Sequence, residues 1–240
     1  MNLALIIAGG CGERMGCTPP KQFIKIAGHP VLAYTLKKFQ AHPAIDAICV
    51  VALAGWESYV REIAETYNLT KLRHITTGGK TGQESIFNGL TELQKHYAPT
   101  DLVLIHDAVR PIIPNTIIDD AIKTATKYGN AVSATPCFEA LTQNNGTEFI
   151  THQNLYRAQA PQCFELGKIL DIHNRAQKQN ITNSITSATL MMQMGEQIFF
   201  CTGSNKNIKL TTPEDFEIFQ AILNNEPDEY NFNNWIWTYL

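Results

Sequence analysis

The sequence lacks the cysteine pairs that structural zinc sites and disulfide frameworks use. Its six cysteines are scattered over 240 residues, and none forms a C-x-x-C pair. No apolar run approaches the ~20 residues of a membrane-spanning helix, and the start of the chain has no signal-peptide pattern. These absences predict a soluble protein of the reducing cytoplasm, without a zinc site, a disulfide framework or a membrane partner.

An excess of charge of one sign is also lacking. Nineteen basic and 22 acidic residues give a net charge of −3, so the chain has no general attraction to nucleic acid or anionic lipid. Positive charge that binds an anionic ligand must therefore come from a local group of basic residues. The 44% hydrophobic and 17% charged content is ordinary for a globular enzyme, and a chain of this length can bury a sizeable core.

Short apolar runs alternate with helical patterns in the first half of the chain. The runs typical of buried strands are 3–8, 47–53, 72–77, 101–106 and 130–136. Apolar residues at helical spacing occupy 31–40, 57–67, 84–97 and 115–129. This alternation predicts an α/β fold of three layers, Rossmann-like, in which helices cover both faces of a mostly parallel sheet. Ligands bind such sheets beyond the carboxyl ends of the strands.

The alternation breaks after residue 137, where 137–162 contains the turn signal NNG between two β-compatible segments. We expect a protruding β-arm at 138–158, whose apolar residues a second subunit would cover in a homodimer. Residues 1–225 then form a single domain, and the aromatic tail 226–240 is expected to dock on the body or on a partner. The remaining predicted elements are helices at 165–178 and 186–194, a strand at 197–203, and a helix opened by TTPEDF.

A glycine-rich stretch, AGGCGERMG, follows the first predicted strand. A dinucleotide-binding fingerprint requires G-x-G-x-x-G. Counted from Gly10 and Gly12, its third glycine should stand at position 15, which is occupied by Met15. The spacing therefore excludes a nicotinamide dehydrogenase loop.

A second glycine pair, in GGKT at 78–81, resembles the end of a Walker A loop. That motif also fails, because His74 stands where its first glycine is required. The remaining interpretation of the first loop is a nucleotidyltransferase loop, whose backbone N–H groups curl around a triphosphate. Arg14 and Lys21 would add positive charge in the same stretch.

Five motifs then occur in order: AGGCGERMG with PKQF, GHPVL, HDAVRP, APQCF and NIKLTTPED. Their order and spacing resemble the cytidylyltransferases that make CDP-methylerythritol, a step of isoprenoid synthesis, and their relatives that make CDP-ribitol. The resemblance covers roughly residues 2 to 225. It implies a nucleotidyltransferase domain in which a phosphate oxygen of a small polyol phosphate attacks the α-phosphorus of CTP and pyrophosphate leaves.

The resemblance also implies roles for residues on the CTP side. The family's catalytic cations around the triphosphate correspond to Arg14, Lys21 and Lys209. Asp107 matches the family's aspartate near the metal, which implies Mg²⁺ as the cofactor. The nucleotide itself is expected to contact Asp107, Ala8, Gly9, Gly10, Gly12, Gly79 and Ser85.

The acceptor side departs from the methylerythritol enzymes. Their Asp-Thr pair in the arm corresponds here to Glu139 and Ala140, and the arm's arginine to His152. Arg110 is expected to hold Asp107 or to reach a phosphate. Further departures are Gly82 in place of an arginine, Ala160 in place of the threonine of TPQ, and ITSA at 185–188 in place of a TDDA-like segment.

The loss of a hydrogen-bonding partner from a buried site costs ~1–3 kcal/mol. These changes together therefore predict a CTP enzyme with an altered acceptor pocket. The first hypothesis is a polyol phosphate cytidylyltransferase most similar to the methylerythritol enzymes. The alternative is a cytidylyltransferase for ribitol 5-phosphate or another alditol or sugar phosphate of a surface glycan, which AGG and HDAVRP favour over the AAG and HDAARP of the methylerythritol enzymes.

A hypothesis of another class is a non-catalytic CTP-binding homologue that has lost its acceptor half. The retention of Arg14, Lys21, Asp107 and Lys209 argues against it, because binding alone does not need cations at the α-phosphate.

Overall fold

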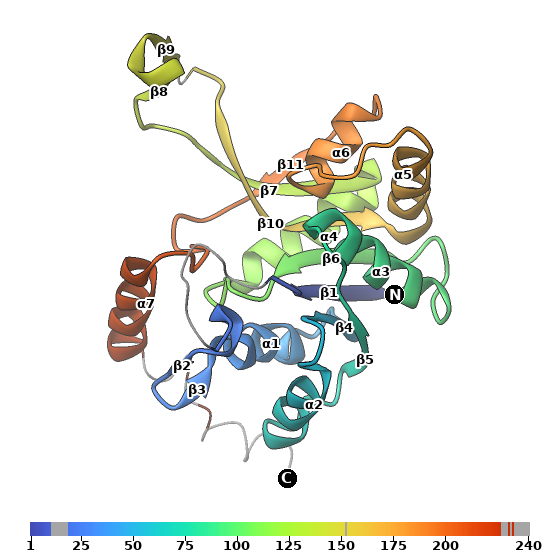
Figure 1. Ribbon diagram of the computed structural model, residues 1–240, viewed down its shortest axis with the longest axis vertical. Helices are drawn as coiled ribbons and strands as arrows, with labels where there is room; N and C mark the ends of the chain where they lie inside the picture. The colour runs from blue at the N-terminus through green and yellow to red at the C-terminus, as the bar shows by residue number, and fades with distance from the viewer. Residues whose placement is uncertain (11–18, 152, 227–229, 231, 233–240) are drawn as a thin grey trace.

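A computed structural model describes residues 1–10, 19–151, 153–226, 230 and 232 of the chain. Its centre is a seven-stranded sheet with the strand order β11-β7-β10-β6-β1-β4-β5 (Figure 1). The strands are β1 (Asn2–Ala8), β4 (Ala47–Ala52), β5 (Leu72–Thr77), β6 (Leu102–Asp107), β7 (Asn130–Pro136), β10 (Tyr156–Glu165) and β11 (Phe200–Thr202). The five strands predicted in the first half are confirmed, with ends that differ by at most one residue.

The sheet is mostly parallel, as predicted. β1 pairs in parallel with β4 and β6, β4 with β5, and β7 with β11. The exception is β10, which runs antiparallel between β6 and β7. The sequence pattern assigns these residues instead to the arm and to the APQCF motif. Pro161 and a register shift between Ala158 and Gln162 interrupt the alternation of side chains that reveals a strand.

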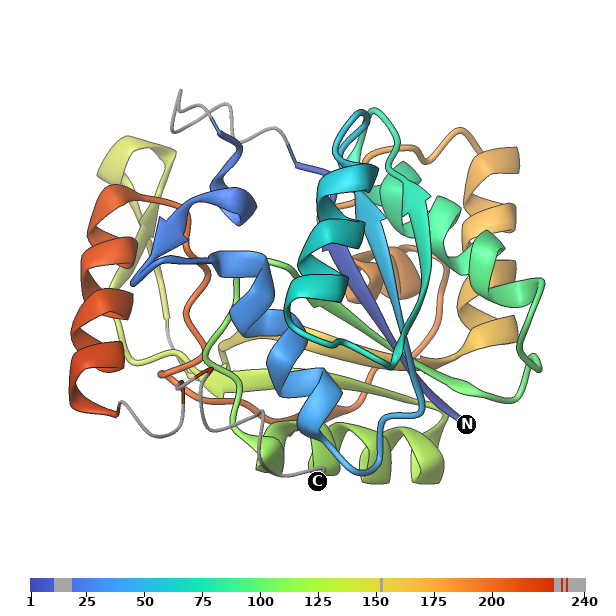
Figure 2. The same cartoon turned by 90° about the horizontal axis from the view of Figure 1, so that it is seen from below.

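Helices cover both faces of the sheet, which gives the predicted three layers (Figure 2). Side chains of β1 alternate between the layers, since Ile6 packs toward α1, α2 and α4 and Leu5 toward α3 and α5. The helices are α1 (Val31–Ala41), α2 (Glu57–Thr66), α3 (Gly82–Gln94), α4 (Asn115–Tyr128), α5 (Leu166–Lys178), α6 (Ser187–Gln193) and α7 (Pro213–Asn225). None of the helices in the described part of the chain is long and apolar enough to cross a bilayer.

Two short pieces extend the core near α7. The strands β2 (Lys25–Ile26) and β3 (His29–Pro30) form a small hairpin after the 3-10 helix η2 (Lys21–Phe23). Helix α7 begins with the capping box of Thr212 and Asp215 and packs on a third apolar cluster. The first described residues of the tail join this region, because Phe232 stacks on His29 with ring centroids 4.1 Å apart. Residues 233–240 lie outside the described part.

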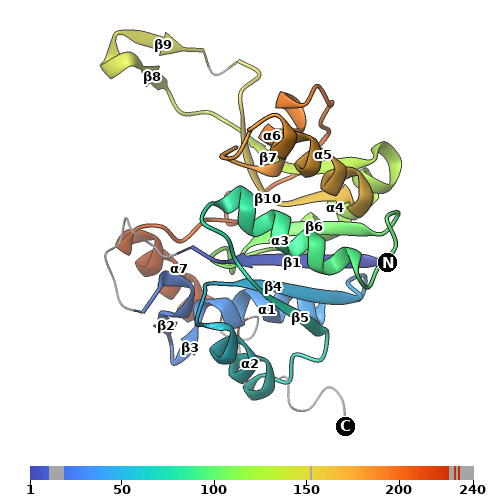
Figure 3. The same ribbon diagram turned by 45° about the vertical axis from the view of Figure 1, so that its right-hand side comes forward.

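The predicted arm is present and projects away from the body (Figures 1 and 3). It consists of β8 (Leu141–Gln143) and β9 (Glu148–Ile150), joined by η3 (Asn144–Gly146) at the NNG turn. Phe138 and Phe149 are 78% and 64% exposed on it.

Candidate active site

A cavity of about 490 Å³ lies at the carboxyl end of the sheet, where β1 and β6 end. The turn before α3, the middle of β10, the start of α6 and the segment that carries Lys209 form its other walls. Two parallel strands that end at the same sheet edge bring the glycine loop and the HDAVRP motif together. The predicted residues that line the cavity are Ala8, Gly9, Gly10, Lys21, Gly79, Ser85, Asp107, Arg110 and Lys209.

Asp107, at the end of β6, is the centre of charge in this cavity. Its Oδ1 lies 2.9 Å from Lys209 Nζ, and its Oδ2 accepts a hydrogen bond from Arg110 Nε at 2.8 Å. Burial alone would raise the pKa of this carboxyl, but the charges of Lys209 and Arg110 hold it well below its usual range. The carboxylate is therefore ionised at any physiological pH.

The same carboxylate could hold a divalent metal. Within the described residues, Asp107 belongs to no group of three metal-ligating side chains, so this part of the chain offers an ion one carboxylate here. Mg²⁺ is commonly bound by one or two carboxylates together with substrate phosphates and water. Each Asp107 oxygen has a lone pair left after its contact with Lys209 or Arg110. The donor set therefore fits Mg²⁺ that a triphosphate carries in.

Asn207 forms hydrogen bonds to two other segments of the cavity wall. Its backbone carbonyl accepts a hydrogen bond from Arg110 Nη1 at 2.7 Å, and its side-chain amide donates to Ala160 O at 2.6 Å. The residue is almost fully buried. Because Lys209 follows two residues later, this network sets the position of Lys209 relative to Asp107. Arg110 thus holds Asp107, and its contact with an acceptor phosphate stays a prediction.

The turn before α3 is shaped by Ser85. Its Oγ accepts a hydrogen bond from Gly79 N at 3.0 Å and donates to Thr81 O at 2.9 Å. A Cβ added to Gly9 would lie 3.2 Å from this Oγ, and one added to Gly78 would lie 3.0 Å from it. The two glycines therefore let the end of β1 approach the turn closely, and Gly9 and Gly79 line the cavity where the two segments meet.

Gln22 closes the base of the glycine loop. Its side-chain amide donates to Ala8 O at 2.7 Å and to Gly10 O at 3.0 Å, and the residue is buried. The loop leaves β1 between these two carbonyls. The predicted residues Gly12 and Arg14 belong to the part of this loop that lies outside the described residues.

The departures from the family pattern lie on the part of the cavity wall that is formed by β10, the first residue of α3 and the segment before α6. Ala160, Gly82 and Ile185 all line it, and Ile185 is 90% exposed. Ser187 is 2% exposed, and its Oγ has no hydrogen-bond partner within the described residues. This wall therefore combines small and apolar side chains with one unsatisfied hydroxyl.

The arm residues predicted to bind the acceptor lie elsewhere. Glu139 and Ala140 are exposed on the arm and do not line the cavity of their own chain. Glu139 instead contacts Arg157 at 3.6 Å and accepts a hydrogen bond from Cys137 Sγ at 3.3 Å. His152 lies outside the described residues. An acceptor role for these residues stays a prediction, and it would require the cavity of a second copy.

Two residues with positioning roles were missed from the sequence. Gln22 and Asn207 stand inside the PKQF and NIKLTTPED motifs, but only the lysines of these motifs were assigned roles. Their partners lie 14 and 47 residues away. Because these partners are distant in the chain, no local sequence pattern indicates the contacts.

Comparisons with known proteins agree with this geometry. The family model IspD, 2-C-methyl-D-erythritol 4-phosphate cytidylyltransferase, matches residues 2–225. A protein of Vibrio parahaemolyticus named ribitol-5-phosphate cytidylyltransferase is 41% identical, over 94% of this chain and 97% of that protein. One of Clostridium novyi named 2-C-methyl-D-erythritol 4-phosphate cytidylyltransferase is 38% identical, over 93% and 97%. The crystal structure of 4-diphosphocytidyl-2C-methyl-D-erythritol synthase from Anaerococcus prevotii superposes with a TM-score of 0.78 at 26% identity, covering 93% of this chain and 96% of that one.

Proposed function

The chain belongs to the 2-C-methyl-D-erythritol 4-phosphate cytidylyltransferase family, and we propose that it transfers CMP from CTP to an alditol phosphate, with ribitol 5-phosphate as the acceptor. The contrast between the two walls of the cavity carries the proposal. Lys21, Asp107 and Lys209, which are expected to face CTP, are all present in the cavity. The wall formed by β10 and the segment before α6, which is expected to face the acceptor, has Ala160 and Ile185 at positions where the methylerythritol enzymes have polar residues. The relative at 41% identity bears the name of a ribitol-5-phosphate enzyme.

The reaction joins a phosphate oxygen of the acceptor to the α-phosphorus of CTP. The bond from that phosphorus to the β-phosphate bridging oxygen breaks, and pyrophosphate leaves. Since such a transfer leaves the protein little covalent work, positioning and charge stabilisation carry the catalysis. Lys21 and Lys209 bring positive charge to the cavity. Gln22 and Asn207 hold the segments that carry these lysines.

The cofactor of the proposed reaction is Mg²⁺, with Asp107 as its protein ligand. When bound, the ion would neutralise triphosphate oxygens and orient the leaving group. Asp107 also contacts Lys209 Nζ at 2.9 Å, so the same carboxylate would position this ammonium group for contact with the triphosphate.

Pyrophosphate release from CTP and Mg²⁺ with a panel of acceptors tests the proposal. We expect kcat/KM to be highest with ribitol 5-phosphate, when it is compared with methylerythritol 4-phosphate, glycerol 3-phosphate and pentose phosphates. Lys21→Ala should abolish turnover without changing the circular dichroism spectrum, and the exposed Lys25→Ala serves as its control. A Lys21→Ala enzyme with full activity would overturn the assigned chemistry.

Methylerythritol 4-phosphate is the second candidate acceptor. The family model and the 38% identical relative support it. A preference for this compound in the panel would replace the ribitol proposal and keep the CTP chemistry. CTP binding without turnover of any acceptor would instead support the non-catalytic homologue, which the retained cations disfavour.

The proposal includes a homodimer that is held by the arm. The arm projects from the body (Figure 3), and Phe138 at its base and Phe149 in β9 are large apolar side chains that are 78% and 64% exposed. An isolated hairpin has little stability of its own in water. Light scattering should give a dimer for the wild type and a monomer for Phe138→Ser/Phe149→Ser. Ile218→Ser, which removes a similarly exposed side chain from α7, should stay dimeric.

The proposed location is the cytoplasm. Cys49, Cys137, Cys163 and Cys201 are buried free thiols, which suit a reducing compartment. Cell fractionation of the native host tests this location.

A further inference from the structure

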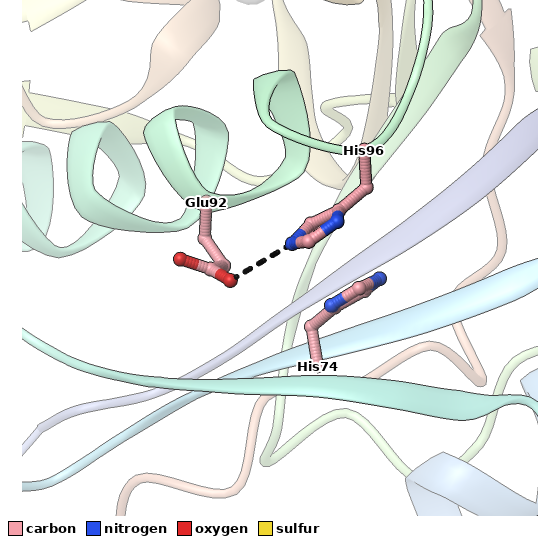
Figure 4. A group of neighbouring side chains, drawn as sticks. All are labelled: His74, Glu92 and His96. Atoms are coloured by element: carbon pink, nitrogen blue, oxygen red, sulfur yellow. Dashed lines mark hydrogen bonds and ion pairs between the residues drawn. The ribbon is translucent and has the colours of Figure 1, made fainter.

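Two histidines and a glutamate meet (Figure 4) at the edge of the sheet formed by β5, on the other side of the molecule from the arm (Figure 1). His74 belongs to β5, the edge strand, and Glu92 belongs to α3, which packs over it. His96 follows the last turn of α3. One ligand atom from each of the three side chains lies within 4.8 Å of the other two. None of the three lines the CTP cavity.

We propose that His74, Glu92 and His96 bind a divalent metal ion of the kind that imidazole ligands favour, and that Zn²⁺ is the ion that fits this site best. Two imidazole nitrogens and one carboxylate oxygen make a three-ligand set typical of tetrahedral zinc with an open fourth position for water. Imidazole ligands favour zinc, copper and nickel over magnesium and calcium. The set contains no thiolate.

The helix places two of the three ligands on one face. Glu92 and His96 are four residues apart, so their side chains project from neighbouring turns of the same stripe. They already interact, since His96 Nε2 lies 3.3 Å from Glu92 Oε1. The imidazole of His74 stacks beneath that of His96 with ring centroids 4.3 Å apart (Figure 4).

His74 is oriented by a residue outside the ligand set. Its Nε2 lies 3.0 Å from Tyr97 Oη, which leaves Nδ1 for a metal. A ligating histidine usually donates its other ring N–H to an oxygen atom, most often of a carboxylate, a backbone carbonyl or water, and this bond fixes the tautomer and the ring orientation; here the oxygen is a tyrosine hydroxyl. With Nε2–H donated to Tyr97, the lone pair of Nδ1 is available.

Metal binding requires one small rearrangement. Ligand atoms around a tetrahedral zinc ion with bonds near 2.1 Å stand about 3.4 Å apart, so the cluster, whose ligand atoms lie up to 4.8 Å apart, has to contract. His96 can make this movement, because its side chain is 44% exposed and lies just beyond the end of α3. Rotation about its side-chain bonds would turn the ring out of the stack and direct a nitrogen toward Glu92 and His74.

A neighbouring cation competes for the carboxylate. Lys95 Nζ lies 2.6 Å from Glu92 Oε2, and Lys95 is well exposed. A metal at this site would share the carboxylate with Lys95 or displace it. The removal of Lys95 should therefore strengthen metal binding, a direction of change that a merely structural cluster would not predict.

Titration of the full chain with Zn²⁺ and Co²⁺ tests the proposal. We expect the wild type to bind one Zn²⁺ per chain at this site. His96→Gln and His74→Gln should each bind it at least tenfold more weakly. The exposed His96 should be replaceable without unfolding, so His96→Gln remains informative if His74→Gln fails to fold. Lys95→Ala should tighten binding by up to about fivefold, the scale of an exposed ion pair.

Two controls separate this site from other metal-binding groups. His29→Gln removes a histidine at another surface and Asp107→Asn removes the cavity carboxylate, and both should bind Zn²⁺ as the wild type does. The Co²⁺ complex should show visible bands of tetrahedral coordination without the near-ultraviolet band of thiolate ligands. Zn²⁺ at about a hundred times its Kd should raise the Tm by about 5–10 °C.

Equal Zn²⁺ affinity in His96→Gln and the wild type would overturn the proposal. So would binding that disappears in Asp107→Asn, or a Co²⁺ spectrum with strong thiolate absorption. Absence of any bound zinc in the wild type would also overturn it, and would leave the stacked rings of His74 and His96 as a packing contact between β5 and the end of α3.

Discussion

Lys209 Nζ lies 2.9 Å from Asp107 Oδ1, although 102 residues separate the two in the chain. Arg110 contacts the second oxygen of the same carboxylate. The two cations share one anion, so this corner of the cavity keeps positive charge that can face phosphate groups. The arrangement forms because the segment before α7, which carries Lys209, folds back onto the end of β6, which carries Asp107.

Substitution of Lys209 tests the pair directly. Lys209→Ala should lower kcat for pyrophosphate release by about 10²–10³-fold, because a preorganised charge beside the reacting phosphates is lost. Lys206→Ala is the matched control, since Lys206 is an exposed lysine paired with Glu226, and it should retain nearly wild-type kcat. Equal losses in both variants would show that Lys209 acts only through the local fold.

The hydrogen bonds from Gln22 to Ala8 O and Gly10 O should affect both the stability of the protein and its binding of CTP. Gln22→Leu removes the donor to Ala8 O and Gly10 O, and should cost about 1–3 kcal/mol of unfolding free energy because those carbonyls lose their partner. Urea denaturation measures this cost. The KM for CTP should rise at the same time, and an unchanged KM would separate these hydrogen bonds from the nucleotide site.

Two glycines of the turn before α3 make a matched pair. Gly78→Ala would place its Cβ 3.0 Å from Ser85 Oγ and 3.3 Å from Ala52 O, so it should destabilise the fold by about 1–3 kcal/mol. Gly82→Ala meets no atom within 4 Å and should leave stability within about 1 kcal/mol of the wild type. Thermal unfolding compares the two, and equal effects would contradict the close approach.

His173 should contribute to acid sensitivity. Burial lowers its pKa from the ordinary value of 6.5 to about 4, so below pH 6.5 the unfolded chain binds a proton that the folded chain does not. Stability is therefore lost as the pH falls from about 6.5 to 4, by at most about 3 kcal/mol from this residue. His173→Leu should show a shallower loss in urea titrations across that range. An unchanged slope would exclude His173 as a source.

The sequence predicted the strands that consist of buried apolar runs. The run 3–8 and its neighbours in the sheet have strong local patterns, because both faces of those strands are covered by helices. It did not predict β10 as a strand of this sheet, because Pro161 and the polar residues Gln159 and Gln162 break the apolar pattern. The two glutamines line the cavity. The strand pattern is therefore weakest where residues of a strand also line the cavity.

The candidate site was predictable on its CTP side for a similar reason. Lys21, Asp107 and Lys209 stand in short motifs whose order could be recognised along the chain. The roles of Gln22 and Asn207 depend on carbonyls that only the folded chain brings near, so no local pattern could reveal them. The same holds for the cluster of His74 and His96, whose members lie on a strand and after a helix.

The attachment of the arm has a consequence for how the protein can vary. The chain leaves the sheet at the end of β7 and returns beside it at the start of β10, where Tyr156 pairs with Pro136. The arm is therefore an insertion between two adjacent, paired positions. Its length and sequence can be exchanged as a cassette while the strand register stays the same, so homologues can differ there without rebuilding the nucleotide half.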